Sequence, residues 1–173
     1  MGSAAIQLGK AINATVIATA GGEEKVAQCF DHGADLAIDY LVDDFVAAVN
    51  DATNGKGADV IFDPVGGDTF RRSTKCIAWE GRLVVIGAAG GDYAEARTNH
   101  ALVKNYSVLG LNWGGYRSRH PELVAEAHDD LMALYHTGAI RPAVSGVESL
   151  TDLPDALSRL TGRSTTGKVV LTP

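Results

Sequence analysis

Short apolar segments alternate with amphipathic segments along this chain of 173 residues. The apolar segments are rich in β-branched residues, as strands are, and they lack the apolar–polar alternation of a half-exposed sheet. The amphipathic segments repeat apolar residues every three or four positions, which is typical of helices. Strands are predicted at 15–19, 35–39, 59–63, 82–86, 107–111, 143–147 and 168–171. The pattern predicts an α/β fold with a doubly wound parallel sheet, covered by helices on both faces.

The helices predicted between these strands are 3–12, 23–32, 43–52, 69–79, 99–104, 121–136 and 152–160. Two helices have clear apolar faces that are expected to point to the core: Val26, Ala27 and Phe30 in one, and Leu123, Ala127, Leu131 and Leu134 in the long one. The glycine-rich stretch after the strand 107–111 is expected to be a loop. The strands 59–63 and 82–86 are expected to be buried because their interiors are apolar throughout.

Three predicted strands end in turns of small residues, namely Gly21–Gly22, Val65–Gly67 and Gly87–Gly91. Ligands of doubly wound sheets bind at the carboxyl ends of the strands. Glycine is common in any such turn, but three of them leave little side-chain bulk along one rim. A flat ligand is therefore expected to lie close to the backbone there.

The first of these turns also bears on which ligand is preferred. An acid at this place in a dinucleotide fold bonds a ribose 2′-hydroxyl, whereas a cation suits a 2′-phosphate. The strand 15–19 is followed by no acid at its end, and Lys25 comes shortly after. The alternative is an ordinary strand-to-helix turn with a solvated lysine, and the adjacent Glu23 and Glu24 weaken the reading as a cation site.

Composition excludes several classes of partner. The net charge is −6 and no basic run occurs, which argues against nucleic acid. No apolar run reaches the ~18 residues of a membrane span, and no export signal is visible, so a cytoplasmic location is expected. Cys29 and Cys76 are far apart and are expected to be buried free thiols.

No side-chain cluster suggests a catalytic or metal site. None of the five histidines has a partner at metal-ligand spacing, and neither a G-x-S-x-G nor a C-x-x-C pattern occurs. We therefore predict no catalytic side chain and no bound metal. Such a chain suits hydride transfer, in which the cofactor performs the chemistry and the protein positions it.

Residues 2–10, G-S-A-A-I-Q-L-G-K, resemble the end of the phosphate-binding turn and the first helix of medium-chain dehydrogenases/reductases, most closely the zinc-independent quinone oxidoreductase branch. Further segments fit that branch in the same order: 14–25, 33–35, 39–40, 57–60, 63–67, 81–84, 105–108 and 167–171. Each motif is weak by itself, but the ordered set is specific and covers essentially the whole chain.

The resemblance implies a Rossmann-like, NADP-binding domain over residues 1–140 and a segment, 141–173, that in the family returns to the catalytic domain. It implies NADPH as cofactor. Lys25, Tyr40 and Arg163 match positions that hold the adenosine 2′-phosphate. The residues that match other parts of the cofactor groove are Gly2, Gly22, Val65, Gly66, Gly87 and Ala88, with Leu111, Asn112 and Trp113 near the nicotinamide.

The sequence also departs from the family pattern. The family's N-terminal catalytic half, the first strand of its nucleotide domain and the first glycines of its fingerprint have no counterpart here. In the family that strand lies between those matching 15–19 and 59–63, so the sheet is expected to lack it, and two strands to have unpaired edges.

Two functions from different classes remain open. One is the nucleotide-binding part of an NADPH-dependent oxidoreductase acting on quinones or other α,β-unsaturated carbonyls. The other is a catalytically inactive binding or assembly module that keeps the fold. An enzyme using S-adenosylmethionine is disfavoured, since that cofactor also wants an acid after the second strand. The apolar segment from Ser107 to Trp113 is expected at the sheet edge, where it predicts a homodimer by strand pairing.

Overall fold

The computed structural model describes residues 1–162 and 165–173. The chain forms two compact units. The central unit comprises residues 38–130, and the terminal unit comprises residues 1–37 with 131–173. Within the described ranges, no helix is both long enough and apolar enough to span a membrane.

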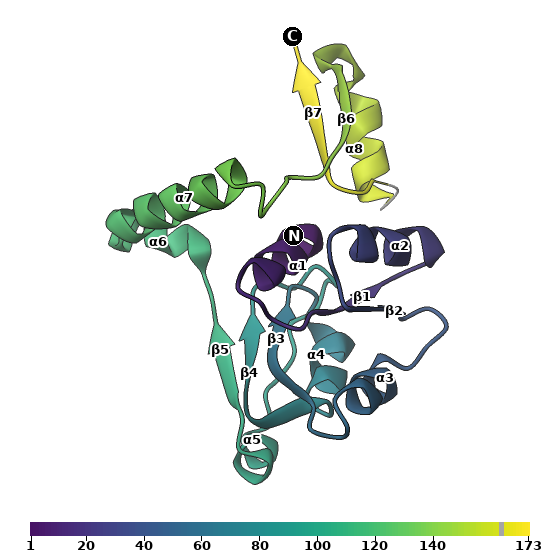
Figure 1. The fold of residues 1–173 in the computed structure, drawn as a ribbon, viewed down its shortest axis with the longest axis vertical. Helices are drawn as coiled ribbons and strands as arrows, with labels where there is room; N and C mark the ends of the chain where they lie inside the picture. Colours follow the sequence, from purple (N-terminus) through teal and green to yellow (C-terminus); the bar gives the residue numbers. More distant parts are fainter. Residues whose placement is uncertain (163–164) are drawn as a thin grey trace. The chain divides into compact units, whose positions relative to one another are not determined.

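The central unit contains a parallel sheet in the order β3-β4-β5, formed by Ala58–Asp63, Ile77–Val85 and Ser107–Gly110 (Figure 1). Its helices are α3 (Phe45–Ala52), α4 (Gly67–Ser73), α5 (Thr98–Lys104), α6 (Trp113–Arg119) and the first part of α7 (Pro121–His136). Strands and helices alternate, as the hydrophobic pattern predicted. The prediction of a parallel α/β fold of the Rossmann type is confirmed.

One face of this sheet carries the core. The buried cluster consists of Phe70, Ile77, Leu83 and Tyr106, with Ile61, Val85, Ala94, Ala101 and Val108 packed against it. Ile61, Leu83 and Val108 are register partners on neighbouring strands, so they share that face. Leu83 is completely buried, as predicted for the strand 82–86. The helices α4, through Phe70, and α5, through Ala101, therefore meet the sheet on this side.

The opposite face of the sheet is open, which corrects the prediction that the strand 59–63 is buried. Val60, Phe62 and Leu109 are 49%, 43% and 44% exposed. Phe62, Val84 and Leu109 are register partners, so the exposed apolar residues form one continuous face. β3 is also an edge strand, whose only partner in this sheet is β4. The apolar strand is thus placed as expected but covered on one side only.

The terminal unit begins with α1 (Gly2–Ala11), β1 (Ile17–Ala20) and α2 (Glu23–Asp31), and β2 (Leu36–Asp39) pairs with β1. Lys10 joins α1 to the start of β2 through an ion pair with Asp35, whose carboxylate also accepts from the Val16 amide at 2.7 Å. The Lys10 hydrogen bond and then the Val16 amide lower the pKa of the Asp35 carboxyl. Both side chains are partly exposed, so the pair contributes little stability.

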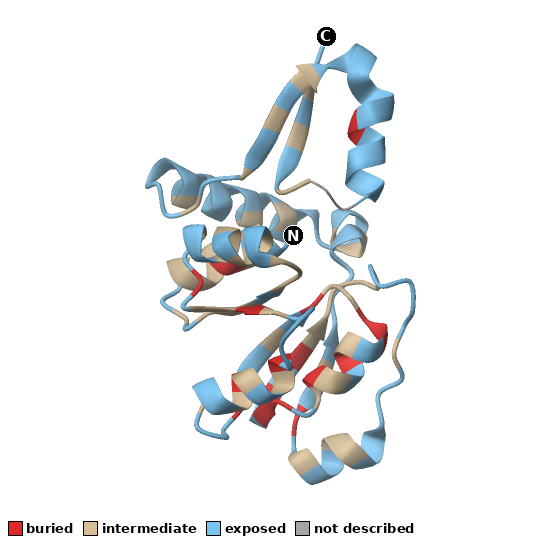
Figure 2. Ribbon diagram, turned by 90° about the vertical axis from the view of Figure 1, so that its right-hand side faces the viewer, coloured by how far each residue is buried: buried red, intermediate tan, exposed pale blue. Residues whose placement is uncertain are grey.

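The end of the chain forms a parallel pair, β6 (Val144–Ser149) with β7 (Lys168–Thr172), and a helix, α8 (Leu153–Thr161), that follows a short 3₁₀ turn at Leu150–Asp152. Arg159 of α8 is paired with Glu148 of β6. Figure 2 shows that these elements are largely exposed; Ala156 is the buried residue of α8. The apolar side chains Val147, Leu157 and Leu160 are 65%, 50% and 58% exposed.

Two helix predictions differ from the structure in position. The predicted helix 69–79 ends at Ser73, because Ile77 pairs with Ala58 and begins β4. Ile77 and Ala78 are almost fully buried, so sheet pairing overrides their helical pattern. The glycine-rich stretch predicted as a loop is α6, which Asn112 caps by accepting a hydrogen bond from the Gly115 amide.

Two helix faces predicted to be in the core are not buried. Phe30 of α2 is 49% exposed and Ala27 is exposed as well. The bounds of α7 are those predicted, yet Leu123 and Leu131 are 42% and 41% exposed and none of its residues is buried. Periodicity places these side chains on one face of a helix, but it does not provide the surface that would cover that face.

Gly57 gives a stability test of the turn before β3. Its φ is +84°, and a Cβ there would lie 2.7 Å from the carbonyl oxygen of Cys76. We predict that Gly57→Ala lowers the free energy of unfolding by about 2–4 kcal/mol, because it adds a main-chain clash to the backbone strain. Gly55→Ala is the matched control, since Gly55 has φ +80° and open space around it, and should cost only about 1 kcal/mol. Urea denaturation of the three proteins measures the difference, and equal losses would contradict the prediction.

Candidate functional site

The carboxyl ends of β3, β4 and β5 lie at the same edge of the central sheet because the strands are parallel. Each strand is followed by predicted site residues, and all of them belong to the central unit. They are Val65 and Gly66 after β3, Gly87 and Ala88 after β4, and Leu111, Asn112 and Trp113 after β5. We call this edge the rim.

The turn after β3 is held by the last residue of that strand. Asp63 Oδ1 accepts hydrogen bonds from the Val65 amide at 2.8 Å and the Gly66 amide at 3.0 Å. Gly66 has φ +76°, and a Cβ there would lie 2.6 Å from the carbonyl oxygen of Asp92. The backbone conformation and the close approach of a neighbouring loop both require glycine at this position.

The turn after β4 is joined to the turn after β3. The Ala89 and Gly90 amides donate to the carbonyl oxygens of Pro64 and Val65, each at 2.9 Å. A Cβ at Gly87 would approach the Pro64 oxygen at 3.5 Å, an ordinary contact. The two turns are therefore joined by hydrogen bonds, and the structure brings Val65, Gly66, Gly87 and Ala88 together.

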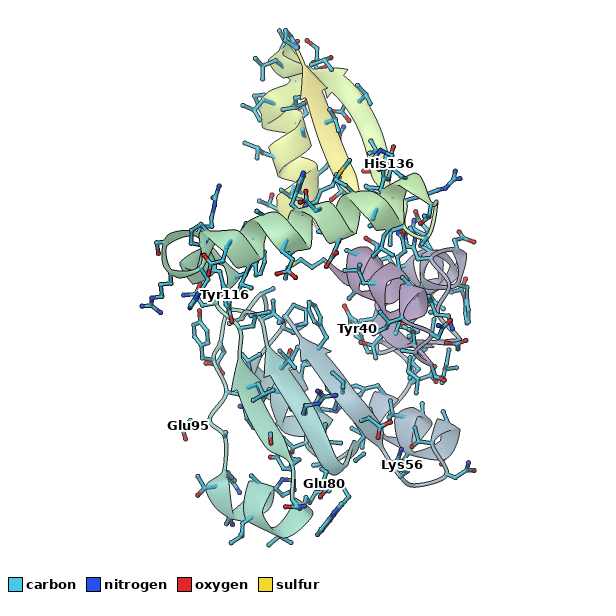
Figure 3. All side chains as sticks on the ribbon, turned by 60° about the vertical axis from the view of Figure 1, so that its left-hand side comes forward. Tyr40, Lys56, Glu80, Glu95, Tyr116 and His136 are labelled. Atoms are coloured by element: carbon cyan, nitrogen blue, oxygen red, sulfur yellow. The ribbon has the colours of Figure 1, made fainter. Side chains whose placement is uncertain are left out.

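The end of β5 is tied to the same sheet and leads into an aromatic cluster. The Leu111 amide donates to the Val85 carbonyl at 3.0 Å. Trp113 stacks on Tyr116, with ring centroids 5.5 Å apart, and Tyr116, which Figure 3 labels on α6, lies 5.8 Å from the His120 ring. Asn112 is a helix cap in this structure, while Trp113 remains 48% exposed at the rim.

The other predicted site residues lie elsewhere in the chain. Gly2 is the first residue of α1, Gly22 precedes α2 with φ +88°, and Lys25 lies half-buried in the first turn of α2, all in the terminal unit. Tyr40, labelled in Figure 3, directly follows β2 and is 46% exposed. Arg163 lies outside the described residues. A shared role of Lys25, Tyr40 and Arg163 stays a prediction.

Asp63 is the residue at the rim that sequence reasoning missed. It is 2% exposed, and its second carboxylate oxygen, Oδ2, is buried without a hydrogen-bond partner within the part of the chain that the structure describes. The available signal was the segment D-P-V-G after a strand, since an aspartate often accepts hydrogen bonds from amides two and three residues further on.

No group of three or more potential metal ligands occurs among residues 1–162 and 165–173. Both cysteines are free thiols, Cys76 buried and Cys29 half-buried. Burial raises the pKa of each thiol. At the turns after β3 and β4, the rim offers main-chain groups and small residues.

Comparison with known proteins agrees with this picture. A family model described as zinc-binding dehydrogenase matches residues 1–129. A quinone oxidoreductase-like protein 2 homolog of Nematostella vectensis is 33% identical over 172 residues, which cover 99% of this chain and 47% of that protein. Quinone oxidoreductase-like protein 2 of Bos taurus is 36% identical over 160 residues, covering 92% of this chain and 46% of that protein.

Solved structures give the same result. Escherichia coli quinone oxidoreductase, solved as a complex with NADPH, matches with a TM-score of 0.88 at 30% identity, over 99% of this chain and 53% of that one. The chain thus spans about half the length of the relatives it matches.

The fold and the rim define a nucleotide-binding domain of the Rossmann type. The chain belongs to the zinc-binding dehydrogenase family, in the quinone oxidoreductase branch of the medium-chain dehydrogenases/reductases, and corresponds to the C-terminal part of such a protein. The resemblance inferred from the ordered sequence motifs is confirmed.

Proposed function

We propose that this chain is the NADPH-binding part of an oxidoreductase that transfers hydride to quinones or other α,β-unsaturated carbonyls. The observation that carries the proposal is the rim, where two strand-end turns are hydrogen-bonded into one body with little side-chain bulk. A relative of the same fold is solved in complex with NADPH, which supports the choice of cofactor.

The rim fits a dinucleotide in its shape and chemistry. Gly87 and Ala88 are small and half-buried, so a flat ligand can lie against main chain there. In this proposal Val65, Gly66, Gly87 and Ala88 line the groove, and Leu111, Asn112 and Trp113 meet the nicotinamide end. Gly2 and Gly22 contribute small turns, while Lys25, Tyr40 and Arg163 recognise the 2′-phosphate.

The cofactor, when bound, supplies the hydride, and the protein's own residues position it. The joined turns would hold the cofactor at the carboxyl edge of the sheet, and Trp113, which is 48% exposed, would help to exclude water from it. No proton transfer is assigned to a side chain, because none of the described residues at the rim is placed for it.

A second candidate is a catalytically inactive nucleotide-binding or assembly module. The observation that favours it is the uncovered apolar surface on both units, including Phe62 on β3 and Leu160 on α8. Exposed apolar faces of this kind mark contacts with other protein surfaces. We expect the 173-residue chain to show no reductase activity by itself, so quinone-dependent oxidation of NADPH by it would favour the enzyme over this module.

The cofactor preference is tested by titrating NADPH and NADH calorimetrically at low and moderate salt. We predict tighter binding of NADPH, and a loss of about tenfold in NADPH affinity for Lys25→Ala and for Arg163→Ala, because each removes a charge-assisted contact of about 1.5–3 kcal/mol with the phosphate. NADH affinity should not change. Lys56→Ala is the control, since Lys56 pairs with Asp59 away from the rim.

Equal affinity for the two cofactors would refute the preference. Loss of NADPH affinity in Lys56→Ala as large as in Lys25→Ala would show that the effect comes from net charge, not from a phosphate site. Binding of neither cofactor would favour the inactive module.

We propose that the chain binds no structural or catalytic zinc, although the family model carries that name. Elemental analysis of the purified protein should find zinc well below one equivalent, because residues 1–162 and 165–173 hold no group of three or more potential metal ligands. Stoichiometric zinc that survives dialysis against a chelator would show this to be wrong.

We also propose a homodimer through β5, the second edge strand of the central sheet. Leu109 is 44% exposed there, and an apolar edge strand favours pairing with a second copy. Leu109→Lys should shift sedimentation from dimer to monomer, whereas Leu102→Lys, on the exposed side of α5, should not. A parent chain that sediments as a monomer at high concentration would contradict the proposal.

A further inference from the structure

Asp63 occupies an unusual position for a carboxylate. It ends β3 at the rim, is 2% exposed, and uses one oxygen for the amides of Val65 and Gly66. Its other oxygen, Oδ2, is buried with no hydrogen-bond partner among the residues described. Burying a polar atom in this way costs free energy. A residue kept at such a cost points to a role beyond packing.

The hydrogen bonds of the turn after β3 indicate a role for Asp63 in fixing the conformation of that turn. The amides of Val65 and Gly66 are bound by Asp63, while the carbonyl oxygens of Pro64 and Val65 are bound by the amides of the β4 turn. The turn is therefore held from both sides in one conformation. Without the carboxylate, the Val65 and Gly66 amides would lose their side-chain acceptor, and the positive-φ conformation of Gly66 would lose that support.

We propose that Asp63 is a positioning residue for the dinucleotide: through Oδ1 it presets the turn from Pro64 to Gly67 in the conformation that the ligand meets. This inference rests on the proposed function. A turn fixed in advance costs less to order on binding, so cofactor affinity depends on Asp63 although Asp63 does not touch the cofactor.

Three variants separate this role from simple structural support. Asp63→Ala removes the acceptor, whereas Asp63→Asn keeps one side-chain oxygen for both amides and removes the buried charge. Asp44→Ala is the matched control: Asp44 caps α3 in the same unit, accepting from the Val46 amide at 3.0 Å and from Arg72 at 2.7 Å, and it is not a rim residue. Each protein is titrated with NADPH by calorimetry and unfolded by heat.

We expect NADPH affinity to fall about tenfold or more in Asp63→Ala, to stay within about threefold of the parent in Asp63→Asn, and to be unchanged in Asp44→Ala despite a lower unfolding midpoint. Hydrogen exchange gives a readout that needs no cofactor. The Val65 and Gly66 amides should be protected in the parent and in Asp63→Asn, and should exchange faster in Asp63→Ala.

Several results would overturn the role of Asp63: parent-like affinity in Asp63→Ala, no rescue by Asp63→Asn, or an equal loss in Asp44→Ala. In each of these the parent binds NADPH, so the proposed function stands. A parent chain that binds neither dinucleotide overturns the proposed function, and the role of Asp63 with it.

Discussion

Main-chain hydrogen bonds between the ends of β3 and β4 set the geometry on which the rim depends. The amides of Ile86, Ala89 and Gly90 donate to three consecutive carbonyl oxygens, those of Asp63, Pro64 and Val65. Main-chain hydrogen bonds between the two segments therefore continue past the strands into the turns. Because the next residue, Gly66, lies against the main chain of Asp92, no side chain can stand there. At Gly66 the rim is main chain because the backbone of Asp92 occupies the place that a side chain would take.

The core beneath the rim lies on one side of the central sheet. Leu83 and Phe70 are buried on that face, while Val60 and Phe62 on β3 remain open to solvent on the other. Arg72 joins α4 to α3 by lying over the Phe45 ring at 4.4 Å and bonding to Asp44. The Arg72 hydrogen bond, and after it the Val46 amide, lowers the pKa of the Asp44 carboxyl. These contacts of Arg72 thus join α3 to α4 within the central unit.

The chemistry of this chain agrees with its family. A hydride-transferring cofactor needs shape and position from the protein more than it needs a nucleophile. The described side chains near the rim cap and stack: Asp63 holds a turn, Asn112 begins a helix, and Trp113 stacks on Tyr116. The chain spans about half the length of its relatives, and apolar side chains such as Phe62 and Leu160 are exposed on it.

The order of elements, the parallel sheet and the three small-residue turns followed from the sequence, because hydrophobic period and glycine position are local properties. Such local rules correctly predicted the bounds of α7 and the turn at Val65–Gly67. Burial was decided by the tertiary structure. The apolar side chains of α7 and β3 are spaced as expected but remain partly exposed. Their spacing does not determine whether another element packs against them. Long-range pairing likewise made Ile77 the start of a strand, although its local pattern is helical. The environment of Asp63 depends on both the sequence and the fold. The sequence places an aspartate two residues before Val65, and only the fold buries it.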